Sequence, residues 1–169
     1  MTSVFSVAKE FFKMKIKKIL FVCTANICRS PMAETILKEK LKNSGMTDIL
    51  VSSAGLMDMK GGRAREEALK IIGGLGVDIS KHRSRHLAGE MVKDVDMIIV
   101  MESGHRDKIL SEYPEVKDKV FLLSSFGNQK GMETDIADPY GGSIFNYRVA
   151  LREISYYIDG LMRYLRGLS

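Results

Sequence analysis

Residues 22–31 read Val-Cys-Thr-Ala-Asn-Ile-Cys-Arg-Ser-Pro. An apolar run, Lys18–Phe21, precedes this stretch, and apolar residues at helical spacing follow it from Met32 to Lys42. This order predicts a buried strand, then a tight loop, then a helix. We expect Ser30 to cap the helix and Pro31 to occupy its first position.

Two side chains of the loop suit phosphate chemistry. A loop at a helix N-terminus offers backbone N–H groups and the positive end of the helix dipole to an anion. The same field lowers the pKa of a thiol, so Cys23 is a candidate nucleophile. Arg29, six residues later, has a planar guanidinium that can hold two phosphate oxygens at once. We therefore expect a phosphate-binding loop with a thiolate at its centre.

The rest of the chain alternates strands and helices. After a first strand at residues 16–22, further strands are expected at 49–51, 95–101 and 120–123, and helices at 65–72, 103–113 and from about 145. This alternation predicts an α/β fold with parallel strands and helices on both faces of the sheet. In such folds the ligand lies beyond the carboxyl ends of the strands, where the loop after the first strand is placed.

Bulk composition narrows the class of protein. The 169 residues fit one domain, which we expect to span residues 16–169 after an N-terminal extension of residues 1–15. The net charge of +5 suits an anionic substrate, and no nucleic-acid motif accompanies the basic residues. No apolar run approaches the ~20 residues that a membrane helix needs. Two cysteines only five positions apart cannot form a disulfide scaffold, so a cytoplasmic location is expected.

Three motifs together resemble one known family. The loop Cys-Thr-Ala-Asn-Ile-Cys-Arg-Ser-Pro, Ser53-Ala54-Gly55 and Asp138-Pro139-Tyr140 are similar to motifs of the low-molecular-weight protein tyrosine phosphatases, and their order and spacing hold from about Lys17 onwards. The resemblance implies a Rossmann-like three-layer sandwich around a four-stranded parallel sheet. It also implies hydrolysis of phosphotyrosine in proteins through a phosphocysteine intermediate, with inorganic phosphate as product and without a metal or cofactor.

The resemblance assigns expected roles to individual residues. Cys23 matches the nucleophile, Arg29 the phosphate-clamping arginine, and Asp138 the general acid that protonates the leaving oxygen and then activates water. The residues alone leave Asp135 as a second candidate acid, although Pro139 stiffens the backbone beside Asp138.

Further loop residues have supporting roles in the same resemblance. Ser30 matches a hydroxyl that steadies the thiolate, Asn26 and Ser53 match residues that hold the loop in shape, and Tyr140 matches an aromatic residue at the pocket mouth. The remaining residues expected around the phosphate are Thr24, Ala25, Ile27 and Cys28.

Several positions depart from the family pattern or stay open. Met57 and Met59 stand where many relatives have an aromatic residue, which leaves the substrate preference open. Ala25 replaces a usual loop glycine, and this matters only if the position needs a positive φ. Cys28 is either a small buried residue or a redox partner that forms a reversible disulfide with Cys23. The three histidines show no ligand spacing and are expected to be structural or at the surface: His82, His86 and His105.

Three other functions compete with a tyrosine phosphatase. The protein-arginine phosphatase branch is similar in Gly141-Gly142-Ser143 but typically has a threonine where this chain has Ile27, so phosphotyrosine is favoured. An arsenate reductase on the same fold needs further cysteines after Cys28, and the sequence has none. A non-catalytic phosphate-binding module would lack the nucleophile or the acid, and candidates for both are present.

Overall fold

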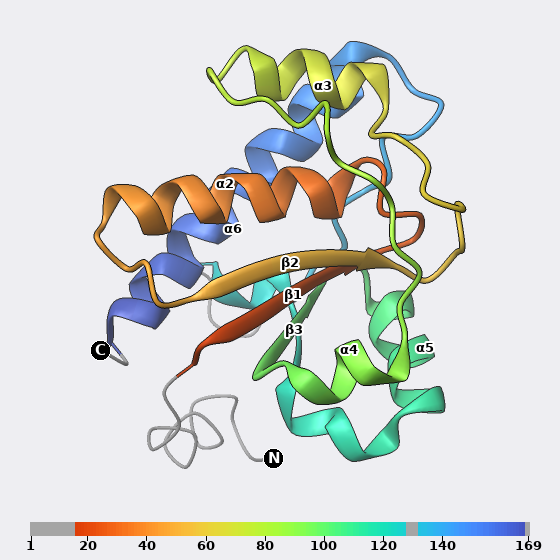
Figure 1. Cartoon of the computed structure of the whole chain (residues 1–169), viewed down its shortest axis with the longest axis vertical. Coiled ribbons are helices and arrows are strands. Elements are labelled where there is room, and N and C mark those ends of the chain that lie inside the picture. The colour runs from red at the N-terminus through yellow and green to blue at the C-terminus, as the bar shows by residue number, and fades with distance from the viewer. Residues whose placement is uncertain (1–15, 128–131, 168–169) are drawn as a thin grey trace.

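A four-stranded parallel sheet forms the centre of the molecule. The computed structural model describes residues 16–127 and 132–167 (Figure 1), so the expected extension at residues 1–15 lies outside the described residues. The strand order is β2-β1-β3-β4, and every neighbouring pair is parallel. The bounds are β1 Lys18–Cys23, β2 Leu50–Gly55, β3 Met97–Val100 and β4 Val120–Leu122. The expected sheet is confirmed, although several strand ends differ by a few residues from the expected ones.

Helices cover both faces of this sheet. On one side α2 and α6 cover the sheet and α3 packs outside them against α6, whereas α4 and α5 lie on the other side (Figure 1). The bounds are α2 Arg29–Asn43, α3 Glu66–Gly73, α4 Gly89–Asp94, α5 Ser103–Glu112 and α6 Ile144–Gly167, with 3₁₀ helices η1 Pro114–Lys119 and η2 Leu123–Phe126. The result is the three-layer α/β sandwich that the sequence predicts. No helix within the described ranges combines the length and apolar character needed to cross a bilayer.

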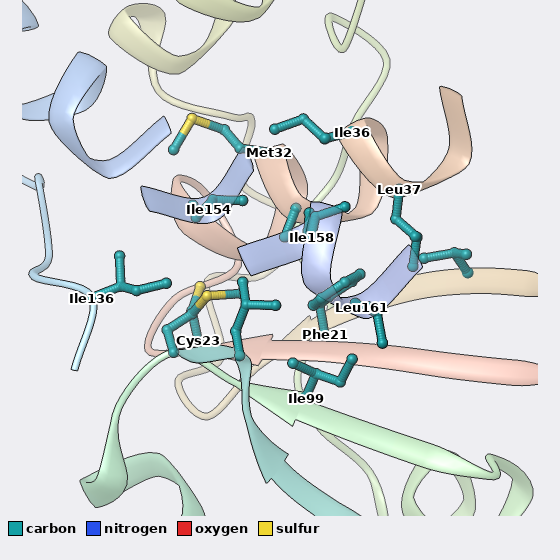
Figure 2. Packing of buried hydrophobic residues seen from close by; sticks show 14 of the residues in the cluster. Phe21, Cys23, Met32, Ile36, Leu37, Ile99, Ile136, Ile154, Ile158 and Leu161 are labelled. Atoms are coloured by element: carbon teal, nitrogen blue, oxygen red, sulfur yellow. The ribbon is translucent and has the colours of Figure 1, made fainter. Parts of the chain in front are cut away.

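The central strand divides the core into two layers. Successive side chains of β1 point to opposite faces of the sheet. Phe21 packs with residues of α2 and α6, as Figure 2 shows, whereas Leu20 and Val22 belong to the second layer with residues of α4 and α5. Cys23 follows Phe21 on the first side, so its side chain lies at the edge of the larger layer.

The start of α2 differs from the expected one. Ser30 does not cap the helix: α2 begins at Arg29, Cys28 occupies the capping position, and no side chain caps the helix. The physical reason is that the Ser30 hydroxyl is used elsewhere, because it contacts the Cys23 sulfur and the Asn26 amide. The first turn of α2 is therefore part of the loop that precedes it.

The carboxyl ends of the strands meet at one edge. Cys23 is paired with Gly55 of β2, and Val22 is paired with Val100 of β3. The segments that leave β1, β2 and β3 consequently begin side by side. This register places the loop at residues 23–29 next to residues from distant parts of the sequence.

Candidate active site

A pocket opens at this edge of the sheet, and three segments line it. The loop after β1 supplies most of its floor, the segment after β2 one wall, and the segment before α6 the other. Its lining residues are Cys23, Thr24, Ala25, Ile27, Cys28, Arg29, Met57, Met59, Asp138 and Tyr140. Nearly every residue that the sequence suggested for substrate contact is therefore in one place. Asn26, Ser30 and Ser53 are buried beneath the loop instead.

A hydrogen-bonded network supports the Cys23 sulfur from below. Cys23 Sγ lies 3.0 Å from Ser30 Oγ, and the Asn26 Nδ2 group donates to Ser30 Oγ and to Ser53 Oγ, each at 2.8 Å. Ser53 in turn donates to the carboxylate of Glu34. The Ser30 hydroxyl accepts a hydrogen bond from Asn26 and lies within donating distance of the Ala54 carbonyl oxygen, at 3.4 Å, as well as of the Cys23 sulfur.

Asn26 also carries the unusual backbone conformation of the loop. Its φ is +54°, whereas Ala25 is absent from the positive-φ residues of the described chain. Asparagine tolerates the left-handed region better than most residues. Because Ala25 does not adopt a positive φ, an alanine at position 25 causes no backbone strain. His82 Nε2 lies 2.8 Å from the Asn26 carbonyl oxygen, and the Arg85 N–H donates to Asn26 Oδ1 at 2.9 Å. The segment before α4 therefore holds the turn in place.

Arg29 is buried, with an exposed fraction of 1%, and two carboxylates hold its guanidinium. Nη1 pairs with the carboxylate of Glu102 and donates to the Ile136 carbonyl oxygen at 2.7 Å. Nη2 lies 2.9 Å from Asp138 Oδ2. Arg29 Nε has no hydrogen-bond partner among the described residues. The guanidinium is thus fixed at the pocket floor with a donor that remains unused.

The structure separates the two candidate acids. Asp138 lines the pocket, and its Oδ1 accepts the Tyr140 N–H at 3.1 Å. Asp135 faces away, toward Ser103, whose N–H donates to Asp135 Oδ1 at 2.7 Å. Of these two carboxylates, Asp138 is therefore the one that lines the pocket.

Sequence reasoning missed two residues that contact the loop from the segment after β3. His105 is buried, and its Nε2 lies 3.0 Å from Thr24 Oγ1. Burial is the main cause that lowers the pKa of His105, and the nearby Glu102 carboxylate partly offsets it. Glu102 itself pairs with Arg29. The available signal was positional, since both residues follow β3 at the carboxyl edge of the sheet, where ligand-contacting residues gather in parallel α/β folds.

Cys28 lies on the inner side of the loop and contacts α6. Its Sγ is 3.4 Å from the Tyr147 hydroxyl, and both cysteines are free thiols. Burial raises the pKa of Cys28 to about 11. Burial also raises the pKa of Tyr147, which lies in the apolar stripe of α6. Cys28 is therefore a neutral thiol at physiological pH.

The mouth of the pocket is formed by flexible apolar side chains and one ring. Met57 and Met59 are exposed on one side and Tyr140 on the other. The guanidinium carbon of Arg65 lies 5.3 Å from the centroid of the Tyr140 ring, a cation–π distance.

One class of phosphatases is defined by an α/β sandwich that carries a cysteine-to-arginine loop at its first helix and an Asp-Pro loop above it. A family model described as "Low molecular weight phosphotyrosine protein phosphatase" matches residues 18–167. The chain belongs to this family and is a phosphatase, as the sequence predicts.

Relatives with two different named activities are similar to this chain. A protein-arginine-phosphatase from Geobacillus stearothermophilus is 40% identical over 88% of this chain and 96% of its own length. A probable low molecular weight protein-tyrosine-phosphatase, EpsP, from Ralstonia nicotianae is 35% identical over 91% of this chain and 99% of its own.

Solved structures divide in the same way. The arginine phosphatase of G. stearothermophilus superposes with a TM-score of 0.80 and 39% identity, covering 89% of this chain and 94% of that one. The tyrosine phosphatase AmsI of Erwinia amylovora gives a TM-score of 0.79 and 32% identity with the same coverage. The fold is therefore common to relatives of both names and does not by itself decide between the two substrates.

Proposed function

We propose that this protein removes phosphate from phosphotyrosine in proteins through a phosphocysteine intermediate. One observation supports this most directly: the Cys23 sulfur, the Arg29 guanidinium and the Asp138 carboxylate meet in a single pocket. In this proposal the loop N–H groups and Arg29 hold the three phosphate oxygens. The sulfur of Cys23 then lies opposite the phenolic oxygen.

In the first step the Cys23 thiolate attacks phosphorus. The bond from phosphorus to the tyrosine oxygen breaks, and its electron pair leaves with that oxygen. Asp138, in its protonated form, supplies the proton that makes this oxygen a phenol. Ser30 holds the thiolate before the attack, since its oxygen lies 3.0 Å from the sulfur. The products of this step are tyrosine and a phosphorylated Cys23.

In the second step Asp138, now a carboxylate, takes a proton from water. The water oxygen attacks phosphorus, the phosphorus–sulfur bond breaks, and Cys23 leaves as a thiolate. Inorganic phosphate is released. General acid and base help of this kind contributes typically ~10²–10⁴ in rate.

Ile27 supports phosphotyrosine over phosphoarginine as the substrate. It is buried and lines the pocket. Its branched apolar side chain packs well against an aromatic ring but offers no hydroxyl to a guanidinium or to a water beside it. Together with Met57 and Met59 it makes the walls largely apolar, which suits an uncharged aryl group.

Protein-arginine phosphatase is the second candidate function. It is supported by the relatives that bear this name and by Gly141-Gly142-Ser143, in which this chain is similar to that branch. A hydrolysis assay at neutral pH distinguishes the two functions. An arginine phosphatase cleaves the phosphorus–nitrogen bond of phosphoarginine peptides, whereas a tyrosine phosphatase cleaves the phosphorus–oxygen bond of phosphotyrosine peptides. Phosphotyrosine, phosphoserine and phosphoarginine peptides of matched sequence should be compared by kcat/KM.

The nucleophile is tested by Cys23→Ser. We expect this variant to lose hydrolysis of a chromogenic aryl phosphate while it still binds inorganic phosphate, measured by calorimetry. Retained hydrolysis would remove Cys23 from the proposal. We also expect activity to survive a chelator, since the proposed chemistry uses no metal.

The proposal also covers the cellular location of the enzyme and the extent of its phosphatase domain. The reaction needs a reduced Cys23 with Cys28 only five residues away, so we place the protein in the reducing cytoplasm. Residues 16–169 would form the phosphatase domain and residues 1–15 a separate extension. Activity of a chain that begins at Met14 would test this division.

A further inference from the structure

Arg65 links the phosphate loop to the mouth of the pocket. Its backbone N–H donates to the Ile27 carbonyl oxygen at 2.9 Å, so it is anchored directly to the loop. Its guanidinium then reaches outward and lies 5.3 Å from the centroid of the Tyr140 ring. Ile27 and Tyr140 both line the pocket. One residue therefore connects its floor with its outer wall.

A buried tyrosine of α6 and a carboxylate lie near the guanidinium. The Tyr147 hydroxyl lies close enough to interact with Arg65, and the same hydroxyl contacts Cys28 Sγ at 3.4 Å. Tyr147 is fully buried in the helix layer, which makes it a rigid support. Glu67 is 3.6 Å from Arg65 Nε, at the long end of an ion-pair distance. The cation therefore lies at the mouth, and this carboxylate offsets part of its charge.

We propose that Arg65 is a specificity-determining residue that excludes positively charged substrate groups from the mouth of the pocket. This inference rests on the proposed function. Because Arg65 occupies one face of the Tyr140 ring, a substrate group has the other face or the edge of the ring available. A neutral aryl group can stack there without an electrostatic penalty.

A cationic group meets two obstacles in the same place. The negative face of the Tyr140 ring already interacts with one cation, so its attraction for a second is reduced. Two positive charges then lie on opposite sides of one ring. A phosphoarginine side chain keeps a guanidinium next to the phosphorus, whereas phosphotyrosine has an uncharged ring there. Arg65 thus favours phosphotyrosine independently of Ile27.

The expected effect is modest and can be measured. Two unit charges separated by about 9 Å, at the effective dielectric constant of a protein surface and screened by about 0.15 M salt, change a rate ratio by about two- to fivefold. The sharpest probe is a pair of phenyl phosphates that carry either a para aminomethyl group, which is cationic, or a para hydroxymethyl group, which is neutral. We expect Arg65→Gln to raise the ratio of kcat/KM for the cationic over the neutral compound by this factor.

Two comparisons separate charge from a merely structural role. Arg65→Lys keeps the charge and should keep the wild-type ratio. Raising the salt to 1 M, where the screening length is only about 3 Å, should move the wild-type ratio toward that of Arg65→Gln. Phosphoarginine and phosphotyrosine peptides should change in the same direction as the two phenyl phosphates.

Arg63→Gln is the matched control, since it removes the same charge two residues earlier in an exposed part of the same segment. We expect it to leave the ratio unchanged. An Arg65→Gln variant with the wild-type ratio would overturn this inference while the proposed function stands, as would an equal change in Arg63→Gln. A wild type that hydrolyses neither phenyl phosphate would instead remove the proposed function.

Discussion

Gly55, the last residue of β2, lies against the backbone of the phosphate loop. A Cβ atom added there would be 2.7 Å from the carbonyl carbon of Ala25 and 2.8 Å from the backbone nitrogen of Asn26. Both neighbours are backbone atoms, so no side-chain rotation relieves the contact. In Gly55→Ala the loop must retreat by roughly 0.7 Å to restore ordinary van der Waals distances.

This displacement should affect stability and rate together. Overpacking of this kind typically costs about 1–3 kcal/mol of the free energy of unfolding. A shift of about 1 Å at a reacting group can cost about 10²-fold in rate. We therefore expect kcat/KM for an aryl phosphate to fall by about 10- to 10²-fold in Gly55→Ala. The inhibition constant of inorganic phosphate should rise as well.

The assay needs a folded variant and a matched glycine. Urea unfolding gives the free energy of unfolding, and steady-state hydrolysis gives kcat/KM under conditions where the variant is folded. Gly73→Ala serves as the control, because Gly73 ends α3 and a Cβ atom added there would meet no neighbouring atom within 4 Å. We expect this control to keep full activity. A folded Gly55→Ala protein with wild-type kcat/KM and phosphate inhibition would refute the close-approach reasoning.

Three other properties of the site can be tested in the same way. Asp138→Ala should lose about 10²–10⁴ in rate on phenyl phosphate and much less on an aryl phosphate with an acidic leaving group, whereas Asp135→Ala should lose little. Burial lowers the pKa of His105 in the folded protein, so the unfolded chain binds a proton at this imidazole more readily. The free energy of unfolding should therefore fall as the pH drops below about 6.5, and it should fall less in His105→Gln. Because burial raises the pKa of Cys28 to about 11, iodoacetamide at a pH of about 7.5 should alkylate Cys23 in the folded protein and leave Cys28 unmodified, as peptide mass spectrometry would show.

Each of these predictions has a clear opposite outcome. Equal losses on good and poor leaving groups would argue against Asp138 as the acid. Parallel stability curves for the wild type and His105→Gln between about pH 5 and 8 would show that this histidine does not titrate on unfolding. Alkylation of Cys28 as fast as Cys23 would contradict the raised pKa of Cys28, and it would also show that this thiol is accessible for redox chemistry.

The sequence by itself determined the local pattern around the loop. The change from a strand pattern to a helix pattern across residues 22–31 placed Cys23 and Arg29 at a strand-to-helix turn. The strand and helix alternation also determined the α/β class. These features depend on neighbours in the chain, because hydrophobic periodicity and turn chemistry act within a few residues. The prediction that Ser30 caps the helix was wrong, because its hydroxyl contacts the Cys23 sulfur instead.

Only the tertiary structure decided which distant side chains meet. Asp135 and Asp138 are alike in sequence, and the chain path between β4 and α6 turns one to Ser103 and the other to Arg29. His105 has only a positional signal in the sequence and Arg65 has none, yet strand register and helix packing bring them to the loop and its mouth. Such contacts join residues far apart in the chain, and they arise when the buried faces of the sheet and helices are packed together.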